Sequence, residues 1–410
     1  MGVRLVKAAV FSYIDPSPSA LNGEGPLFGK RATVQASIAV KGWPTEANSP
    51  ALHGYLPLED ATVVERLKAA GAILVGSTQS SELGFGLSRD GAARALTERH
   101  GDVALMTDTM GEARVAAASA GLFGFKPSYG RVSRFGLVGL VPSMDCCSIL
   151  GKAPDDLAAV FHAIAGADER DPSLADDPAP NLAPRSDRKA ATPIVGFVAE
   201  CLETLNTAER TAFREALARL EQAGCEVQEV AFADFDLFRA IHNLIGSVEA
   251  SSSCGKFDGV RYGHRAAGAK NWNEMYLQSR GESFGLLLKA YLFQGAYFQF
   301  QDYPAFERAC RIRARLVKES RSLFRRVDLL ASPTRRAIID PSRAGTVDQV
   351  YDAFSLTLPA SLTGQPALTL PNFLTDQVGD LGLQLVGPFF GDEQLLELGW
   401  QLSRPVEGAR

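Results

Sequence analysis

The run "DTMGEAR", residues 108–114, has the setting of a catalytic loop but carries bulky side chains at its centre. Small residues flank the run, and its flanks predict tight turns, the start of a helix and then a strand. Glu112 contributes a carboxylate, a group that serves as a base or a nucleophile in glycosidases. Met110 contributes an apolar side chain, which we expect to fill a gap in the packing.

Histidine and cysteine offer little further chemistry. The five histidines and six cysteines are dispersed, without a C-x-x-C pair or a zinc-binding spacing, so we expect no metal and no cofactor. Scattered cysteines favour a reduced, cytoplasmic protein. A thiolate at Cys146 or Cys147 would be a strong nucleophile, but no histidine lies near them in the sequence. We therefore expect both to be small buried side chains.

Composition narrows the class of protein and of partner. The chain has 410 residues, 46% hydrophobic and 22% charged, which is ordinary for a soluble globular protein. Its net charge of −5 gives no reason to expect direct binding to nucleic acid. No apolar run reaches the roughly 18 residues of a membrane-spanning helix, so we expect no membrane association. A small ligand, a partner enzyme subunit or a second copy of the chain remain as partners.

Helix and strand signals alternate along most of the chain. Residues 60–71, "DATVVERLKAAG", predict an amphipathic helix, and residues 72–76, "AILVG", predict the strand that follows it. A strand, a helix and another strand are predicted again within residues 193–232. This alternation predicts an α/β fold built on one mixed sheet.

The same signals suggest how the chain is divided. Residues 1–27 carry turn signals and predict an N-terminal leader, and residues 28–410 predict a single α/β domain. Within that domain, residues 167–192 are rich in Pro, Asp, Ala and Ser and predict an exposed linker. Residues 233–327 are expected to be mostly helical.

Several long motifs resemble, in the same order, those of the amidase signature family. They are "GPLFGKRATVQASIAVKGWPTEANSPAL", "DATVVERLKAAGAILVGSTQSSELGFG" and "GLFGFKPSYGRVSRFGLVGLVPSMD". The resemblance covers roughly residues 25–400, and within the family the chain is most similar to the A subunits of glutamyl-tRNA amidotransferases. It implies the amidase signature fold, a large mixed β-sheet flanked by helices on both faces.

The family hydrolyses or transfers amides with a Lys–Ser–Ser triad, in which one serine attacks and the other relays its proton to a neutral lysine. Consecutive backbone N–H groups of a glycine loop stabilise the oxyanion. On this chain the lysine position is Gln35 and the nucleophile position is Glu112. An amide cannot take and return a proton at neutral pH, so Gln35 cannot be the base. A carboxylate is a poor nucleophile towards an amide and places negative charge where the oxyanion would form.

The relay serine corresponds to Ser88, which lies 24 residues before Glu112 as in the family, beside a stretch that is shorter than the family's. Arg89 replaces the serine that follows, and Met110 replaces the first glycine of the loop. The candidate site residues are three degenerate triad positions and four positions of the former oxyanion loop and pocket: Gln35, Ser88 and Glu112, and Arg89, Thr109, Met110 and Gly111.

Three functions are compatible with this site. The first is a homologue that has lost amide hydrolysis and acts as a binding, regulatory or accessory subunit. The second is an amidase-type C–N hydrolase with a rebuilt active site that uses Glu112, Ser88 or a nearby thiol. The third is an amidotransferase-like subunit that needs a second chain for activity.

For the first function we expect Glu112 to be ionised at the old triad. Its partners would be the amide of Gln35, the hydroxyl of Ser88 and the charge of Arg89, because a buried carboxylate without partners is costly. A former amidase pocket of this kind would prefer a cationic or hydrogen-bond-donating ligand.

Overall fold

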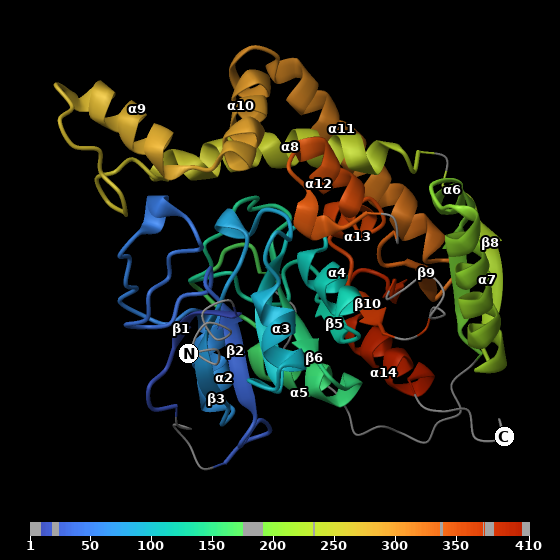
Figure 1. The fold of residues 1–410 in the computed structure, drawn as a ribbon. Helices are drawn as coiled ribbons and strands as arrows, with labels where there is room; N and C mark the ends of the chain where they lie inside the picture. Colours follow the sequence, from blue (N-terminus) through green and yellow to red (C-terminus); the bar gives the residue numbers. More distant parts are fainter. Residues whose placement is uncertain are drawn as a thin grey trace.

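A computed structural model describes residues 10–18, 24–174, 192–232, 234–336, 339–371, 373 and 381–403 (Figure 1). Its strands are β1 (Phe11–Ile14), β2 (Arg31–Gln35), β3 (Ile73–Thr78), β4 (Val103–Asp108), β5 (Phe123–Lys126), β6 (Cys146–Gly151), β7 (Ile194–Val198), β8 (Glu226–Val230), β9 (Leu329–Pro333), β10 (Ala367–Leu370) and β11 (Leu383–Val386). Its α-helices are α2 (Thr62–Ala69), α3 (Gly91–Thr97), α4 (Glu112–Ser119), α5 (Pro154–Ile164), α6 (Ala199–Glu203), α7 (Thr207–Gln222), α8 (Leu237–Ser253), α9 (Trp272–Ser283), α10 (Leu286–Phe300), α11 (Tyr303–Leu323), α12 (Val347–Ala353), α13 (Leu358–Thr363) and α14 (Asp392–Leu402).

The described strands form one 11-stranded sheet with the order β1-β3-β2-β4-β6-β5-β10-β11-β9-β7-β8. Strand β2 is parallel to both β3 and β4, and β7 is parallel to both β8 and β9. The strands between these two parallel groups pair antiparallel. The sheet is therefore mixed, as the sequence predicted.

Helices cover both faces of the sheet. Along β4 the side chains alternate: Ala104 and Met106 pack in one apolar core, whereas Val103 and Leu105 pack in the other. The first core includes residues of α3, α4, α8 and α10 to α13, and the second includes residues of α2, α5, α7 and α14. This arrangement confirms the predicted α/β fold and gives β4 a buried position between two layers of helices.

Two parts of the segment before residue 28 form backbone hydrogen bonds with the rest of the fold. Strand β1 pairs antiparallel with β3 at the edge of the sheet, with Phe11 opposite Thr78. The backbone N–H of Leu27 donates a hydrogen bond to the carbonyl of Ala70, at the end of α2. Within the predicted leader, β1 is thus bonded to the sheet and Leu27 to the end of α2.

Most of the predicted linker, residues 175–191, lies outside the described residues. The part before it is packed against the domain, because Asp168 accepts hydrogen bonds from Thr62 and Ser133, and Asp171 accepts one from the backbone of Arg134.

The segment expected to be mostly helical holds α8, α9, α10 and α11. Helices α10 and α11 form a hairpin that stands above α8 at the top of the view in Figure 1, while α9 extends to one side. Among the described helices, none is both long and apolar enough to cross a membrane.

Candidate functional site

The run "DTMGEAR" joins a buried strand to a helix. Strand β4 ends at Asp108, and α4 begins at Glu112 after a three-residue loop. Gly111 has φ +136°, and a Cβ atom there would lie 2.0 Å from Oγ1 of Thr357. The same Thr357 hydroxyl donates a 2.6 Å hydrogen bond to the carbonyl of Met110. The loop therefore requires glycine at 111 and is held against the segment that precedes α13.

The carboxylate of Glu112 turns back onto this loop. Only 2% of the residue is exposed, and its Oε2 accepts hydrogen bonds from three consecutive backbone N–H groups. The N···O distances are 2.8 Å from Thr109, 2.8 Å from Met110 and 3.1 Å from Gly111. Its second oxygen, Oε1, is buried and has no hydrogen-bond partner among the described residues. The carboxylate thus occupies the nest formed by the loop's own N–H groups.

Burial also changes the protonation of this carboxylate. Loss of solvation, with a smaller contribution from the nearby charge of Asp108, raises the pKa of Glu112 to about 7. The N–H donors of Met110 and Thr109 act in the opposite direction because they favour the ionised form. Burial therefore favours the protonated form of this side chain more than in an exposed glutamate, whereas we expected it to be ionised.

The expected partners of Glu112 were wrong. Gln35 is buried at the end of β2, but its Oε1 accepts hydrogen bonds from the hydroxyl of Ser37 and from both the N–H and the hydroxyl of Thr107. Ser88 is exposed, and its hydroxyl donates to Oγ of Ser81 at 3.1 Å. Neither side chain is bonded to Glu112, whose carboxylate is held by backbone N–H groups instead.

Arg89 is also directed elsewhere. It is exposed, and its guanidinium donates to Oε1 of Gln79 at 3.2 Å. The aspartate beside the loop takes its counter-charge from a different arginine: Arg114 and Asp108 form a fully buried ion pair with a shortest distance of 2.9 Å. Arg114 also donates to Gln384 and Ser361, so its charge is used in joining α4 to the C-terminal part of the fold.

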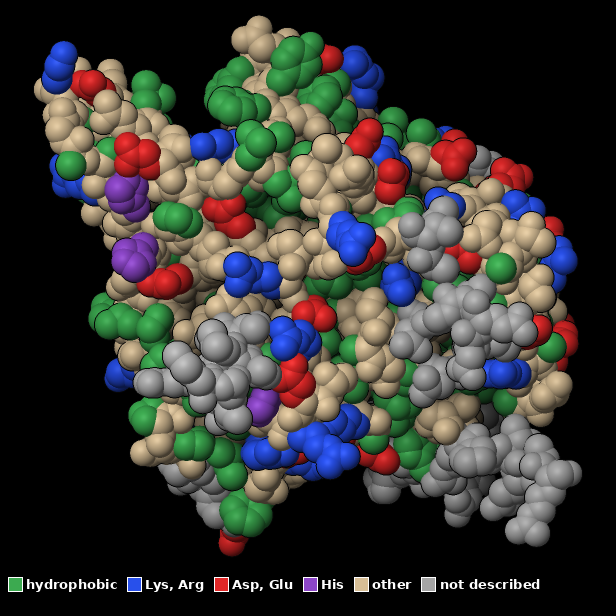
Figure 2. Space-filling model, viewed as in Figure 1, with side chains coloured by type: hydrophobic (Ala, Val, Ile, Leu, Met, Phe, Trp, Pro, Cys, Tyr) green, Lys and Arg blue, Asp and Glu red, His purple; other side chains and the backbone are tan. Residues whose placement is uncertain are grey.

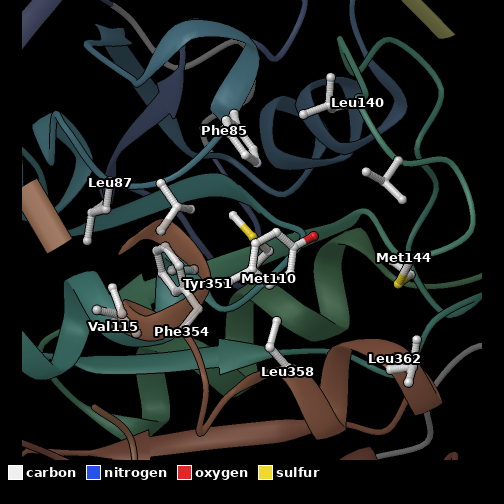
Figure 3. Close-up of a cluster of buried hydrophobic side chains, with 14 of the residues drawn as sticks. Phe85, Leu87, Met110, Val115, Leu140, Met144, Tyr351, Phe354, Leu358 and Leu362 are labelled. Atoms are coloured by element: carbon white, nitrogen blue, oxygen red, sulfur yellow. The ribbon is translucent and has the colours of Figure 1, made fainter. Parts of the chain in front are cut away.

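Met110 fills a gap in the apolar packing, as the sequence predicted. It is 1% exposed and belongs to the first core. Figure 3 shows its side chain beside Tyr351, within a group that includes Phe85, Leu140 and Leu358. Apolar side chains, among them that of Met110, therefore fill the space next to the loop.

A series of buried hydrogen bonds connects the loop to His242 of α8. No feature of the sequence predicted it. The carbonyl of Thr109 can only accept, so Nε2 of His242 donates to it at 3.1 Å. Nδ1 of His242 then accepts from the hydroxyl of Tyr351 at 3.0 Å, and that oxygen accepts from Tyr291 at 2.8 Å. Burial lowers the pKa of His242 to about 4, which keeps the imidazole neutral.

Asp145 lies on the other side of the loop and was also missed. Its carboxylate accepts hydrogen bonds from the hydroxyl of Thr109 at 2.6 Å and from the backbone N–H groups of Leu140 and Val141. Burial raises the pKa of Asp145 to about 6. Thr109 is thus hydrogen-bonded to both carboxylates, through its N–H to Glu112 and through its hydroxyl to Asp145.

A cavity of about 230 Å³ adjoins Asp145. Its lining includes Thr107 and three basic residues, Arg134, Arg170 and Lys256, but does not include Glu112. The first two arginines are already paired with acidic side chains, whereas Lys256 is exposed and its ammonium lies over the ring of Phe257. The lining also includes two acidic residues, Asp145 and Asp171, so basic and acidic side chains both line the cavity.

The two adjacent cysteines are buried, as expected. Cys146 and Cys147 both lie in β6, and loss of solvation raises the pKa of each thiol. A raised pKa disfavours the thiolate that would be needed for attack. In the described part of the chain no cluster of three or more His, Cys, Asp or Glu residues could hold a metal ion.

Comparisons with known proteins agree with the fold and the motifs. The family model described as Amidase matches residues 13–91 and 88–396, two segments that overlap at residues 88–91. Several relatives are A subunits of glutamyl-tRNA(Gln) amidotransferases. The chain is 34% identical to the one from Symbiobacterium thermophilum, a match that covers 93% of this chain and 83% of that protein. It is also 34% identical to the one from Natronomonas pharaonis, over 93% of this chain and 96% of that protein.

Solved structures show the same architecture. A crystal structure of an amidase superposes with a TM-score of 0.79 and 26% identity, covering 98% of this chain and 93% of the other. The counterpart of these A subunits from Thermotoga maritima gives a TM-score of 0.78 at 24% identity, over 96% of this chain and 87% of the other. By its family model, its relatives and its fold, this chain belongs to the amidase signature family.

Proposed function

We propose that this chain does not hydrolyse amides and acts as a binding or accessory subunit. The observation that carries this proposal is the position of Glu112, whose Oε2 accepts hydrogen bonds from Thr109, Met110 and Gly111. Acyl transfer to a nucleophile creates an oxyanion that must be met by free N–H donors. Here the carboxyl group of Glu112 already accepts from those donors, so they are not free to bind a substrate oxyanion.

The rest of the site gives no replacement for the missing groups. Gln35 stands at the position of the base and uses its carbonyl oxygen to accept hydrogen bonds from Thr107. Ser88 is bonded only to Ser81 among the described side chains, so no base lies next to its hydroxyl. The buried thiols of Cys146 and Cys147 favour the protonated form.

The ligand of such a protein would enter the cavity beside Asp145. Three basic residues line this cavity beside Asp145 and Asp171, and Lys256 is the basic one for which no acidic partner is seen among the described residues. We therefore propose a small ligand with a hydrogen-bond-accepting or acidic group that reaches Lys256. This replaces the expectation of a cationic ligand, which depended on Glu112 facing the pocket.

A role beside another protein is supported by the relatives, several of which are named as A subunits of amidotransferases. The third function, an amidotransferase-like subunit that is active only with a second chain, would also require a partner protein. The six free cysteines, five of them buried, are consistent with the cytoplasmic location that we propose.

Ammonia release tests the loss of hydrolysis. We expect purified wild-type protein to release no more ammonia from glutamine or simple carboxamides than a heat-inactivated sample does. The Glu112→Ser variant should remain inactive, because Gln35 still cannot accept the proton. Release by the wild type that is abolished in Ser88→Ala or Glu112→Gln would contradict the proposal and establish a rebuilt hydrolase.

A further inference from the structure

Helix α10 presents an unusual face to solvent. Its exposed residues are Leu286, Ala290, Phe293, Tyr297 and Phe300, and all of them are apolar or aromatic. The neighbouring helix α11 exposes charged residues, among them Glu307, Arg308 and Arg311, as a solvated helix usually does. Figure 2 shows hydrophobic side chains gathered at the top of the molecule, where α10 lies in Figure 1.

The exposed residues of α10 are separated by four, three, four and three positions. This spacing places them on one seam of the helix and is the pattern by which one helix packs lengthwise against another. A scattered set of exposed apolar residues would need no explanation, but a continuous seam of them indicates a covered surface. We propose that this seam is the contact between two copies of this chain.

The order of side chains along the seam fits an antiparallel pair of α10 helices related by a two-fold axis. Phe293 is the middle residue of the five, so it lies at the axis and meets Phe293 of the second copy. About this centre, the small Ala290 lies next to the large Tyr297 of the second copy, and Leu286 lies opposite Phe300. Small residues against large ones allow two helices to interdigitate.

The charge on α10 is also compatible with self-association. Lys289 is the one charged residue of this helix, and it flanks the seam without occupying it. In the antiparallel pair the two Lys289 residues lie eight positions apart, about 12 Å along the axis at 1.5 Å per residue. Each would instead lie beside Tyr297 of the second copy, a favourable arrangement for a cation and an aromatic ring.

The exposed area is close to what a stable dimer needs. Phe293, Tyr297 and Phe300 are 74%, 55% and 73% exposed, which leaves on the order of 400 Å² in contact with solvent at roughly 200 Å² for each full side chain. Leu286, Leu277 and Tyr303 bring the surface to on the order of 700 Å². A standard interface buries about 800 Å² on each partner.

The surface beside the seam is hollowed rather than flat. A cavity of about 230 Å³ lies between α9 and α10, lined by Leu277, Phe284, Leu292 and Phe293 among others. An apolar side chain of the second copy could enter it, so the surface offers shape as well as area.

Sedimentation velocity on the full-length wild-type chain tests this inference, and we expect a concentration-dependent dimer below about 100 µM. Phe293→Glu and Phe293→Lys should each weaken the dimer by at least about thirtyfold, because each puts two like charges at the axis. An equimolar mixture of the two variants should restore a dimer. Leu58→Glu, at a leucine that is 89% exposed in the loop before α2, is the matched control and should dimerise as the wild type does.

Melting curves will show whether the variants remain folded, which we expect because Phe293 is mostly exposed. A wild type that is monomeric at about 100 µM would overturn the inference. So would single variants that dimerise normally, or a mixture of the two that stays monomeric.

Discussion

Replacing Glu112 with glutamine should change how the stability of this protein depends on pH. In the folded chain the pKa of Glu112 is raised from 4.5 to about 7, so the folded state holds this proton more tightly than the unfolded state. The free energy of unfolding should therefore fall as the pH rises from about 4.5 to above 7. At roughly 1.4 kcal/mol for each pH unit, the loss from this group is about 3 kcal/mol.

Glu112→Gln keeps the shape and an oxygen that can accept from the three loop N–H groups, but it cannot titrate. Its amide nitrogen would take the place of Oε1, which has no partner among the described residues, so we expect a constant cost of about 1–3 kcal/mol. The variant should thus be less stable than the wild type near pH 5 and should approach or exceed it above pH 8.

Urea unfolding followed by tryptophan fluorescence between pH 5 and 8.5 measures this difference. Asp145→Asn is the matched control, because the carboxyl of Asp145 also has a raised pKa, of about 6. Its removal should change how the free energy of unfolding decreases below about pH 6. The decrease between pH 6 and 8, which comes from Glu112, should remain. Parallel curves for the wild type and Glu112→Gln across this range would refute the buried position of the carboxylate.

Three further results are expected. Gly111→Ala should cost about 2–4 kcal/mol, measured by urea unfolding, because its Cβ atom would lie 2.0 Å from Thr357 in a backbone conformation that favours glycine; an unchanged midpoint would show that the loop is wrongly placed. Tyr351→Phe should lower the free energy of unfolding by about 1–3 kcal/mol, because His242 loses its hydrogen-bond donor and Tyr291 loses its acceptor. An unchanged free energy of unfolding in the same assay would exclude these buried hydrogen bonds. The purified chain should melt in one cooperative transition, because its local patterns agree with its fold, whereas a broad transition in calorimetry would point to an obligate partner.

The sequence predicted the elements well where hydrophobic periodicity and turn residues agreed. Helix α7 is an example, because its apolar face and its ending were visible in the sequence. The start is harder to predict: Asn206 caps this helix, in a capping box with Glu209, although the next residue, Thr207, is also of a type that caps helices. Asn206 and Thr207 could both cap a helix, and only the path of the backbone before the helix decides which of them does.

The site was predicted in part. The side-chain types at Gln35, Met110 and Glu112 are the reason why we propose that the usual base, loop and nucleophile are absent. The partners of Glu112 were not predictable, because backbone N–H groups have no signature in the sequence. His242 and Tyr351 are 109 residues apart, and their contact with the loop depends on how α8 and α12 pack.

A crystal structure of the wild-type protein at high resolution tests the central claim most directly. The account predicts the carboxylate of Glu112 within about 3.1 Å of the backbone nitrogens of Thr109, Met110 and Gly111, with Met110 buried. A carboxylate turned away from the loop, with a water molecule or a ligand oxygen bound to those three N–H groups, would contradict it.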